Sequence, residues 1–273
     1  MLVACTLLSA CGTKMAYGYL DWAIQWKIRG LVPLTSEQKQ QTKLASVAFH
    51  QWHQSTQLSQ YADYLESLKA LLEKGPVTEK IIHAETDKVQ LLLDQSLRFA
   101  LPSILQLSQS LTDKQVDELL ESFKEDREEY RNENVDISED KKYQNRYKEL
   151  RSHIKPWFGR LDKKQRELIH LWSRSLKPYE TYNVKIKANW EEDLRLALEK
   201  REDLAELEKS IKPLLSTETD SWEPEIEAVF DYNQHLTLEL LAELVNNLSD
   251  KQKEHMFDKF DDYIKICRDL ARK

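Results

Sequence analysis

An internal repeat, present once near the middle of the 273-residue chain and once at its end, restricts the possible folds most. The first copy spans Phe99–Tyr130 and the second spans His235–Cys267. Each copy has an apolar run at helical spacing, the motif Leu-[Thr/Ser]-Asp-Lys-Gln, and a second apolar run in which Phe123 and Phe260 share one offset. This order predicts two helices joined by a short turn.

The motif at the centre of the repeat has the pattern of a capping box. In such a box the side chain of the cap residue accepts a hydrogen bond from the backbone amide of the third helical residue. The Gln side chain of that third residue accepts a hydrogen bond from the backbone amide of the cap residue. Capping boxes are common in helical proteins, and each motif taken singly carries only that interpretation. Two further motifs have the same form, so the predicted repeat helix caps are Thr35, Thr112, Asp162 and Ser249.

The spacing of the four motifs predicts that the chain has two halves, because Leu34 and Leu111 are separated by about as many residues as Leu161 and Leu248. With five Gly, seven Pro and 32% charged residues, the chain has little turn material for a sheet. We therefore expect an all-α protein, an elongated helical bundle built from two repeated three-helix halves joined by a connecting helix.

Five segments are expected along the chain. They are a lipoprotein signal peptide at 1–10, a lipidated aromatic segment at 11–33, the first helical repeat at 34–137, the connecting helix at 138–160 and the second repeat at 161–273.

Apolar periodicity and turn residues predict the individual helices. In the first half we expect one long helix at 35–73, a second at 78–109 bent near Pro102, and a third at 112–131. Pro156 and Gly159 are expected to end the connecting helix at 138–155. In the second half we expect helices at 162–176, 179–215, 222–246 and 249–273, with a Ser/Thr/Asp loop at 216–221.

The first thirteen residues carry no charge and include Leu8-Ser9-Ala10-Cys11, which resembles the lipobox of bacterial lipoproteins. This resemblance implies cleavage before Cys11 and acylation of Cys11 with palmitate-type chains. The run is too short to span a bilayer and has the length of a signal-peptide core. A short buried apolar segment is the alternative. Because no Lys or Arg precedes the run, we expect the true start codon upstream.

Aromatic residues are dense at 17–33, where Trp22 and Trp26 share one helix face. This region and the next resemble the DUF6279 family of bacterial lipoproteins of unknown function. The matching residues are Cys11, Tyr19-Leu20-Asp21-Trp22, Trp26, Leu34, Gln38, Trp52-His53, Leu58 and Tyr61-Ala62. The resemblance implies a lipid-anchored envelope protein and brings no known active site.

The sequence contains no strong motif for catalysis or for cofactor binding, so we expect a non-enzymatic protein with no cofactor. The five Gly residues are isolated from one another and form no phosphate-binding loop, and the net charge of −7 is spread along the chain, which disfavours nucleotide and nucleic-acid binding. His50 and His53 lie one helical turn apart and could hold a metal, but a structural pair is the favoured interpretation. Cys267 continues an apolar series and is expected in the core. An enzyme with a site in the bundle core remains the third hypothesis.

Two functional hypotheses follow from the pattern. The repeated Leu-Thr-x-x-Gln motif is similar to that of the periplasmic Spy and CpxP family, which implies chaperone or envelope-stress activity toward unfolded clients. A structural or adaptor lipoprotein that binds one envelope partner is the alternative. Gly12, where the sorting rule of enteric-type bacteria places Asp for inner-membrane retention, favours the periplasmic face of the outer membrane.

The first candidate for a partner-binding surface is formed by Tyr19, Trp22 and Trp26. The alternative is that these rings pack against the long helix at Trp52 and are part of the core.

Overall fold

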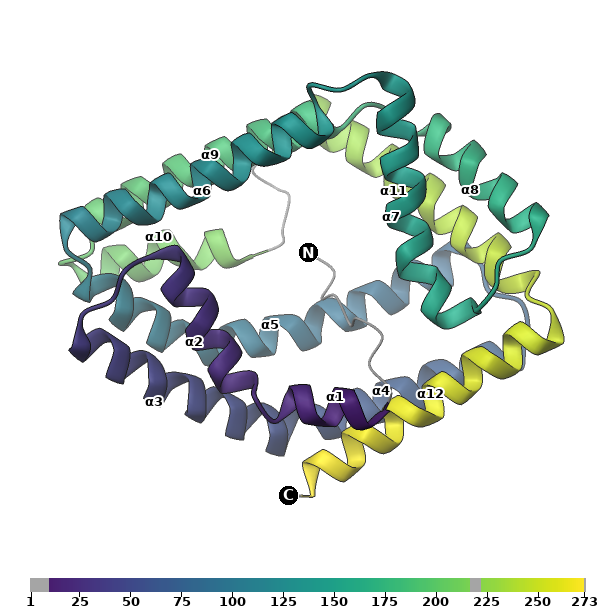
Figure 1. The fold of residues 1–273 in the computed structure, drawn as a ribbon, viewed down its shortest axis with the longest axis horizontal. Helices are drawn as coiled ribbons and strands as arrows, with labels where there is room; N and C mark the ends of the chain where they lie inside the picture. The colour runs from purple at the N-terminus through teal and green to yellow at the C-terminus, as the bar shows by residue number, and fades with distance from the viewer. Residues whose placement is uncertain (1–9, 217–221, 273) are drawn as a thin grey trace.

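The computed structural model describes residues 10–216 and 222–272, and these residues are helical with no strand among them. The all-α prediction is therefore confirmed (Figure 1). Along the chain the elements are α1 (Ala10–Tyr17), α2 (Leu20–Leu31), α3 (Ser36–Trp52), η1 (His53–Gln57), α4 (Leu58–Lys74), α5 (Glu79–Ser110), α6 (Asp113–Asn134), α7 (Glu139–Phe158), α8 (Lys163–Ser175), α9 (Glu180–Glu199), α10 (Leu204–Leu215), α11 (Pro224–Asn246) and α12 (Asp250–Ala271).

The four capping motifs each begin a helix. Thr35, Thr112, Asp162 and Ser249 have extended backbone, and each accepts a side-chain hydrogen bond from the amide of the Gln three residues later. Each Gln side chain in turn accepts from the backbone amide of its cap residue, so both halves of the capping box are present. The boxes satisfy amides that the first turn of a helix leaves without partners.

The capping glutamines also bind one another in two reciprocal pairs. Gln38 Nε2 donates to Gln115 Oε1 at 3.1 Å and Gln115 Nε2 donates to Gln38 Oε1 at 2.7 Å. Gln165 and Gln252 exchange the same two bonds at 3.1 and 2.9 Å. All four side chains are buried, so each pair joins two helix starts through a fully bonded polar contact inside the core.

The single helix expected at 35–73 is instead interrupted by the π-helical turn η1. The amide of Leu58 bonds to the carbonyl of His53, five residues back, which defines a π turn. The extra residue shifts the helical phase and brings Gln57, which is fully buried, inward between α3 and α4. Beyond the turn, α4 buries Leu58 and Ala62, whereas the buried residues of α3 are the polar Gln38, Thr42 and Ser46.

Two other boundaries differ from expectation. The predicted helix at 179–215 is divided into α9 and α10, because Asp203 caps a new helix by accepting from the amides of Ala205 and Glu206. Pro156 does not end α7. It lies in the last turn, and the helix ends at Gly159, whose φ of 66° is readily adopted only by glycine.

Helices from distant parts of the chain lie side by side. In Figure 1, α6 runs along α9 on one edge, α12 runs along α4 on the opposite edge, and α5 crosses between them. Thus α6, the last helix of the predicted first repeat, packs on α9 of the predicted second repeat. In the same way α12, the last helix of the second repeat, packs on α4 of the first. One apolar core lies around Leu198 and Leu207, another around Ile169 and Leu244.

Several expectations concern residues outside the described part of the chain. The predicted signal peptide lies almost entirely at 1–9, and most of the predicted loop at 216–221 is also outside it. Among the described residues, none of the helices has the length and apolar composition needed to cross a bilayer.

Candidate functional site

The aromatic residues of the N-terminal segment lie on the outer face of α2. The inner face packs on α3, with Gln25 buried and Ile28 against the first core. On the outer face, Tyr19 is 62% exposed, Trp22 57% and Trp26 64%. The two indoles stack with ring centroids 6.4 Å apart and an interplanar angle of 15°. We call Tyr19, Trp22, Trp26 and the exposed Met15 the aromatic ridge.

The alternative that these rings pack against the long helix at Trp52 is wrong. Trp52 stacks instead on Phe99 of α5, with ring centroids 4.3 Å apart and an interplanar angle of 12°. Phe49 meets both rings and completes this cluster between α3 and α5. Phe99 therefore covers the ring of Trp52, and the residues of the ridge are exposed.

The charge of this region differs from that of the whole chain. Residues 10–34 carry Lys14, Lys27 and Arg29 but only one acidic residue, Asp21, whereas the complete chain has a net charge of −7. Lys27 and Arg29 are exposed beside the ridge, and Lys14 pairs with Asp269 of α12 at 2.6 Å. Cys11 lies in α1, and its side chain is outside the described part of the structure.

A histidine–tyrosine cluster joins α1 to the body of the protein. His53 Nδ1 lies 2.9 Å from the hydroxyl of Tyr17, and its Nε2 lies 3.2 Å from the hydroxyl of Tyr61. His50 packs edge-on against the Tyr17 ring and lies 3.6 Å from Asp21. Because both nitrogens of His53 bond to tyrosines, the arrangement is that of a structural pair and not of two metal ligands.

Burial changes the protonation equilibria in this cluster. Desolvation, with a smaller contribution from His50, lowers the pKa of His53 to about 4. Desolvation also raises the pKa values of Tyr17 and Tyr61 above their usual range. His53, Tyr17 and Tyr61 are therefore uncharged over a wide range of pH, and they hold α1 through neutral hydrogen bonds.

We expect this cluster to make stability depend on pH. Below pH 6.5 the unfolded chain binds a proton at His53, whereas the folded chain does not until about pH 4, so stability is lost as the pH falls through this window. Partial solvation reduces the effect to about 1–3 kcal/mol. Urea unfolding at several pH values should show this loss in the wild type and not in His53→Gln. The variant His153→Gln, at an exposed position of α7, is the control and should behave as the wild type does.

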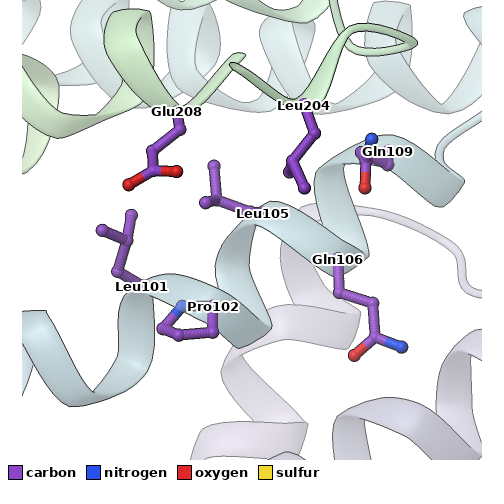
Figure 2. A pocket seen from close by; sticks show the side chains of 7 residues that line it. All are labelled: Leu101, Pro102, Leu105, Gln106, Gln109, Leu204 and Glu208. Atoms are coloured by element: carbon purple, nitrogen blue, oxygen red, sulfur yellow. The ribbon is translucent and has the colours of Figure 1, made fainter. Parts of the chain in front are cut away.

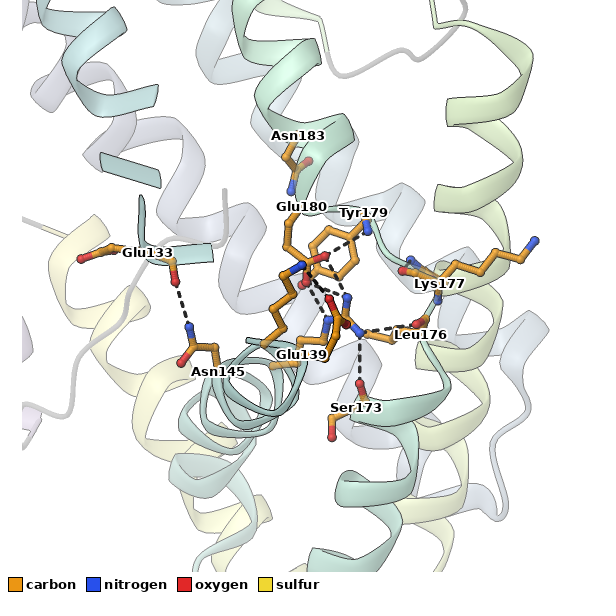
Figure 3. A network of polar contacts seen from close by, with 12 residues as sticks. Glu133, Glu139, Asn145, Ser173, Leu176, Lys177, Tyr179, Glu180 and Asn183 are labelled. Carbon is orange, nitrogen blue, oxygen red and sulfur yellow. Dashed lines mark hydrogen bonds and ion pairs between the residues drawn. The ribbon is translucent and has the colours of Figure 1, made fainter. Parts of the chain in front are cut away.

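A buried ion pair fixes the junction between α7, α8 and α9. Arg146 of α7 binds both oxygens of Glu180 of α9, with Nε–Oε1 and Nη2–Oε2 distances of 2.7 and 2.9 Å. Its Nη1 donates to the carbonyls of Ser173 and Leu176, at the end of α8. Figure 3 shows these bonds converging beside Tyr179, whose ring lies 5.0 Å from the guanidinium carbon. Sequence reasoning missed this pair because both residues belong to ordinary charged helical segments.

Part of α5 lies open to solvent. Val89 is 49% exposed, Leu91 59% and Leu93 39%. Residues four apart share a helix face, whereas Leu91 lies on the opposite side from Val89 and Leu93. The helix is therefore uncovered on two sides over this stretch, which we call the open stretch of α5. Unpaired apolar side chains on two faces of a helix are unusual in a packed core.

A groove of about 280 Å³ lies farther along α5, where it meets α10. Figure 2 shows Leu101 and Leu105 of α5 facing Leu204 and Glu208 of α10 across it. The groove is shallow, and its walls are mainly aliphatic. It extends the apolar surface of α5 and offers no converging set of charged groups.

Among the described residues, the one group of three or more candidate metal ligands is Glu79, His235 and Glu239. His235 Nδ1 lies 2.5 Å from Glu79, and Nε2 lies 3.4 Å from Glu239. The hydrogen bond to Glu79 raises the pKa of His235. Its two nitrogens face different carboxylates, so the geometry is that of a surface ion-pair network between α5 and α11.

The fold and these surfaces define an all-helical protein with an aromatic ridge and a long helix partly open to solvent. A family model described as a family of unknown function (DUF6279) matches residues 31–227, which is most of the chain. The chain belongs to this family, which confirms the resemblance seen in its sequence. No curated protein and no solved structure matches it.

Proposed function

We propose that this protein is a non-enzymatic lipoprotein of the bacterial envelope, held by acyl chains on Cys11 and facing the periplasm from the outer membrane. Its activity is to bind polypeptide segments that expose apolar side chains. The observation that carries this proposal is the open stretch of α5, where Val89, Leu91 and Leu93 are exposed on two sides of one helix. The lipobox-like sequence at Leu8–Cys11 supports the anchor.

The open stretch can gain from binding. Burying a fully exposed Val or Leu side chain contributes about 1.5–3 kcal/mol, and roughly half of this remains available at Val89, Leu91 and Leu93, which suffices for a weak and reversible complex. The groove between α5 and α10 is a second surface of the same helix that exposes apolar side chains. The Leu-Thr-x-x-Gln motifs add the likeness to Spy and CpxP proteins, which supports a chaperone over other binding roles.

The test is an aggregation assay with the soluble form that begins after Cys11. An equimolar amount of this protein should slow light scattering by an unrelated denatured protein without ATP. The triple variant Val89→Ser, Leu91→Ser, Leu93→Ser should lose most of this effect while circular dichroism shows the wild-type helix content. Leu171→Ser, on α8, removes an equally exposed leucine elsewhere and is the matched control.

The outcomes separate the two binding hypotheses. Absence of suppression by the wild type would reject the chaperone and favour an adaptor lipoprotein that recognises one envelope partner through the same surface. Suppression that is unchanged in the triple variant would keep the activity and exclude the open stretch of α5 as its site. Mild cross-linking in membranes, followed by co-purification, would then identify the adaptor's partner.

A further inference from the structure

We propose that the aromatic ridge of α2 lies in the headgroup region of the membrane that anchors the protein, and that it fixes the orientation of the helical body on that membrane. This inference rests on the proposed acylation of Cys11. It assigns the ridge to lipid and leaves the open stretch of α5 for polypeptide.

The position of the ridge in the chain places it near the bilayer. α1 has eight residues and is therefore about 12 Å long, and α2 follows it after a short turn at Gly18. Tyr19, Trp22 and Trp26 recur every three or four residues from the N-cap of α2 onward and are all exposed, so they form one stripe along the outer surface of α2. The exposed Met15 lies in α1, before the turn. A tether this short keeps the stripe at a high effective concentration of lipid headgroups.

The chemistry of the ridge matches an interface and not a hydrocarbon core. Trp and Tyr combine an apolar ring with a polar group, and for this reason they gather at the level of lipid headgroups. Helices that lie in this plane have aromatic residues on one face and Lys or Arg beside them. In α2, Lys27 and Arg29 are exposed next to the stacked indoles.

The net positive charge of residues 10–34 favours an orientation in which this segment faces anionic lipid. Residues 10–34 carry three basic residues and one acidic residue, although the chain as a whole has a net charge of −7. Anionic headgroups attract the basic N-terminal segment and repel the acidic remainder within about 10 Å. The contacts that attach this segment to the body, Lys14–Asp269 and Tyr17–His53, then transmit its orientation to α12 and η1.

The experiment measures how close the ridge indoles lie to lipid. The lipidated full-length mature protein is reconstituted in phosphatidylethanolamine–phosphatidylglycerol vesicles, with or without bromine on the acyl carbons nearest the glycerol. Bromine quenches indole fluorescence only at short range. The variant Trp22→Phe, Trp26→Phe keeps the apolar stripe, so the wild-type signal minus the variant signal reports these two rings. We expect brominated lipid to reduce this difference signal about twofold.

Trp190→Phe is the matched control, because Trp190 lies on α9 and packs against Phe123. The corresponding difference signal for Trp190 should be unchanged by brominated lipid. Equal signals for the ridge indoles in brominated and plain vesicles would overturn the membrane assignment. If a denatured client then shields the two rings from an aqueous quencher, the ridge is a polypeptide site. Failure of the protein to remain with the vesicles at all would instead reject the acyl anchor on which the proposal rests.

Discussion

We expect the wild-type protein to incorporate labelled palmitate in growing cells, and replacing Cys11 by Ser should abolish this incorporation. Cys11 follows the lipobox-like sequence Leu8-Ser9-Ala10, and its thiol is the acceptor that we propose. A single acyl chain holds a protein only marginally on a membrane, so the several chains of a bacterial lipoprotein are needed for stable attachment. The unlabelled variant should therefore also leave the membrane fraction.

The other two cysteines provide matched controls for this experiment. Cys5→Ser changes a residue of the predicted signal peptide, and Cys267→Ser changes a residue buried with Leu58 and Ala62 between α4 and α12. Both variants should be labelled as the wild type is, provided that Cys267→Ser still folds. A wild-type protein without label, or a Cys11→Ser protein that retains it, would contradict the proposed anchor.

Removing one partner of the Arg146–Glu180 pair should be among the most destabilising single changes in the chain. Arg146→Ala leaves a carboxylate that is 4% exposed without its charged partner. Breaking a buried ion pair in this way costs about 3–5 kcal/mol. Urea unfolding followed by circular dichroism measures the loss.

A double variant separates the pair's own contribution from the penalty for a lone buried charge. Arg146→Met with Glu180→Leu replaces both charges by apolar side chains of similar size, and such replacements are often close to neutral. We expect the double variant to recover most of the stability that Arg146→Ala loses. Arg195→Ala, which breaks a solvent-exposed pair with Glu192, is the control and should leave the unfolding midpoint unchanged. A midpoint for Arg146→Ala equal to that of the wild type would contradict the structural role of the pair.

Local sequence signals predicted the helical class and most helix starts. The capping motifs at Thr35, Thr112, Asp162 and Ser249 begin helices because a capping box satisfies its own hydrogen bonds within four residues. The break between α9 and α10 had a similar signal, Asp203 with Glu206 three residues later, but it lay inside a continuous apolar periodicity. Because the apolar periodicity continues through Asp203, the sequence predicted one helix where the structure has α9 and α10.

Features that depend on distant partners could not be predicted from the sequence. The sequence left open whether the N-terminal tryptophans pack at Trp52 or are exposed, and Phe99 is the ring that stacks on Trp52. The reciprocal bonds between Gln38 and Gln115 also require two turns to meet in space, and their spacing alone does not reveal this contact. The same holds for Arg146 and Glu180, which look like residues of solvated helix faces until α7 and α9 come together.

The packing of α12 along α4 has a consequence for the order in which the protein can fold. Arg268 binds Asp63 across a sequence separation of 205 residues, and the neighbouring pair Lys69–Asp261 joins the same two helices. α4 therefore lacks its partner until the C-terminal helix has been synthesised, and contacts of this range slow folding. The export that we propose would suit this delay, because α4 would cross the inner membrane before the helix that completes its packing.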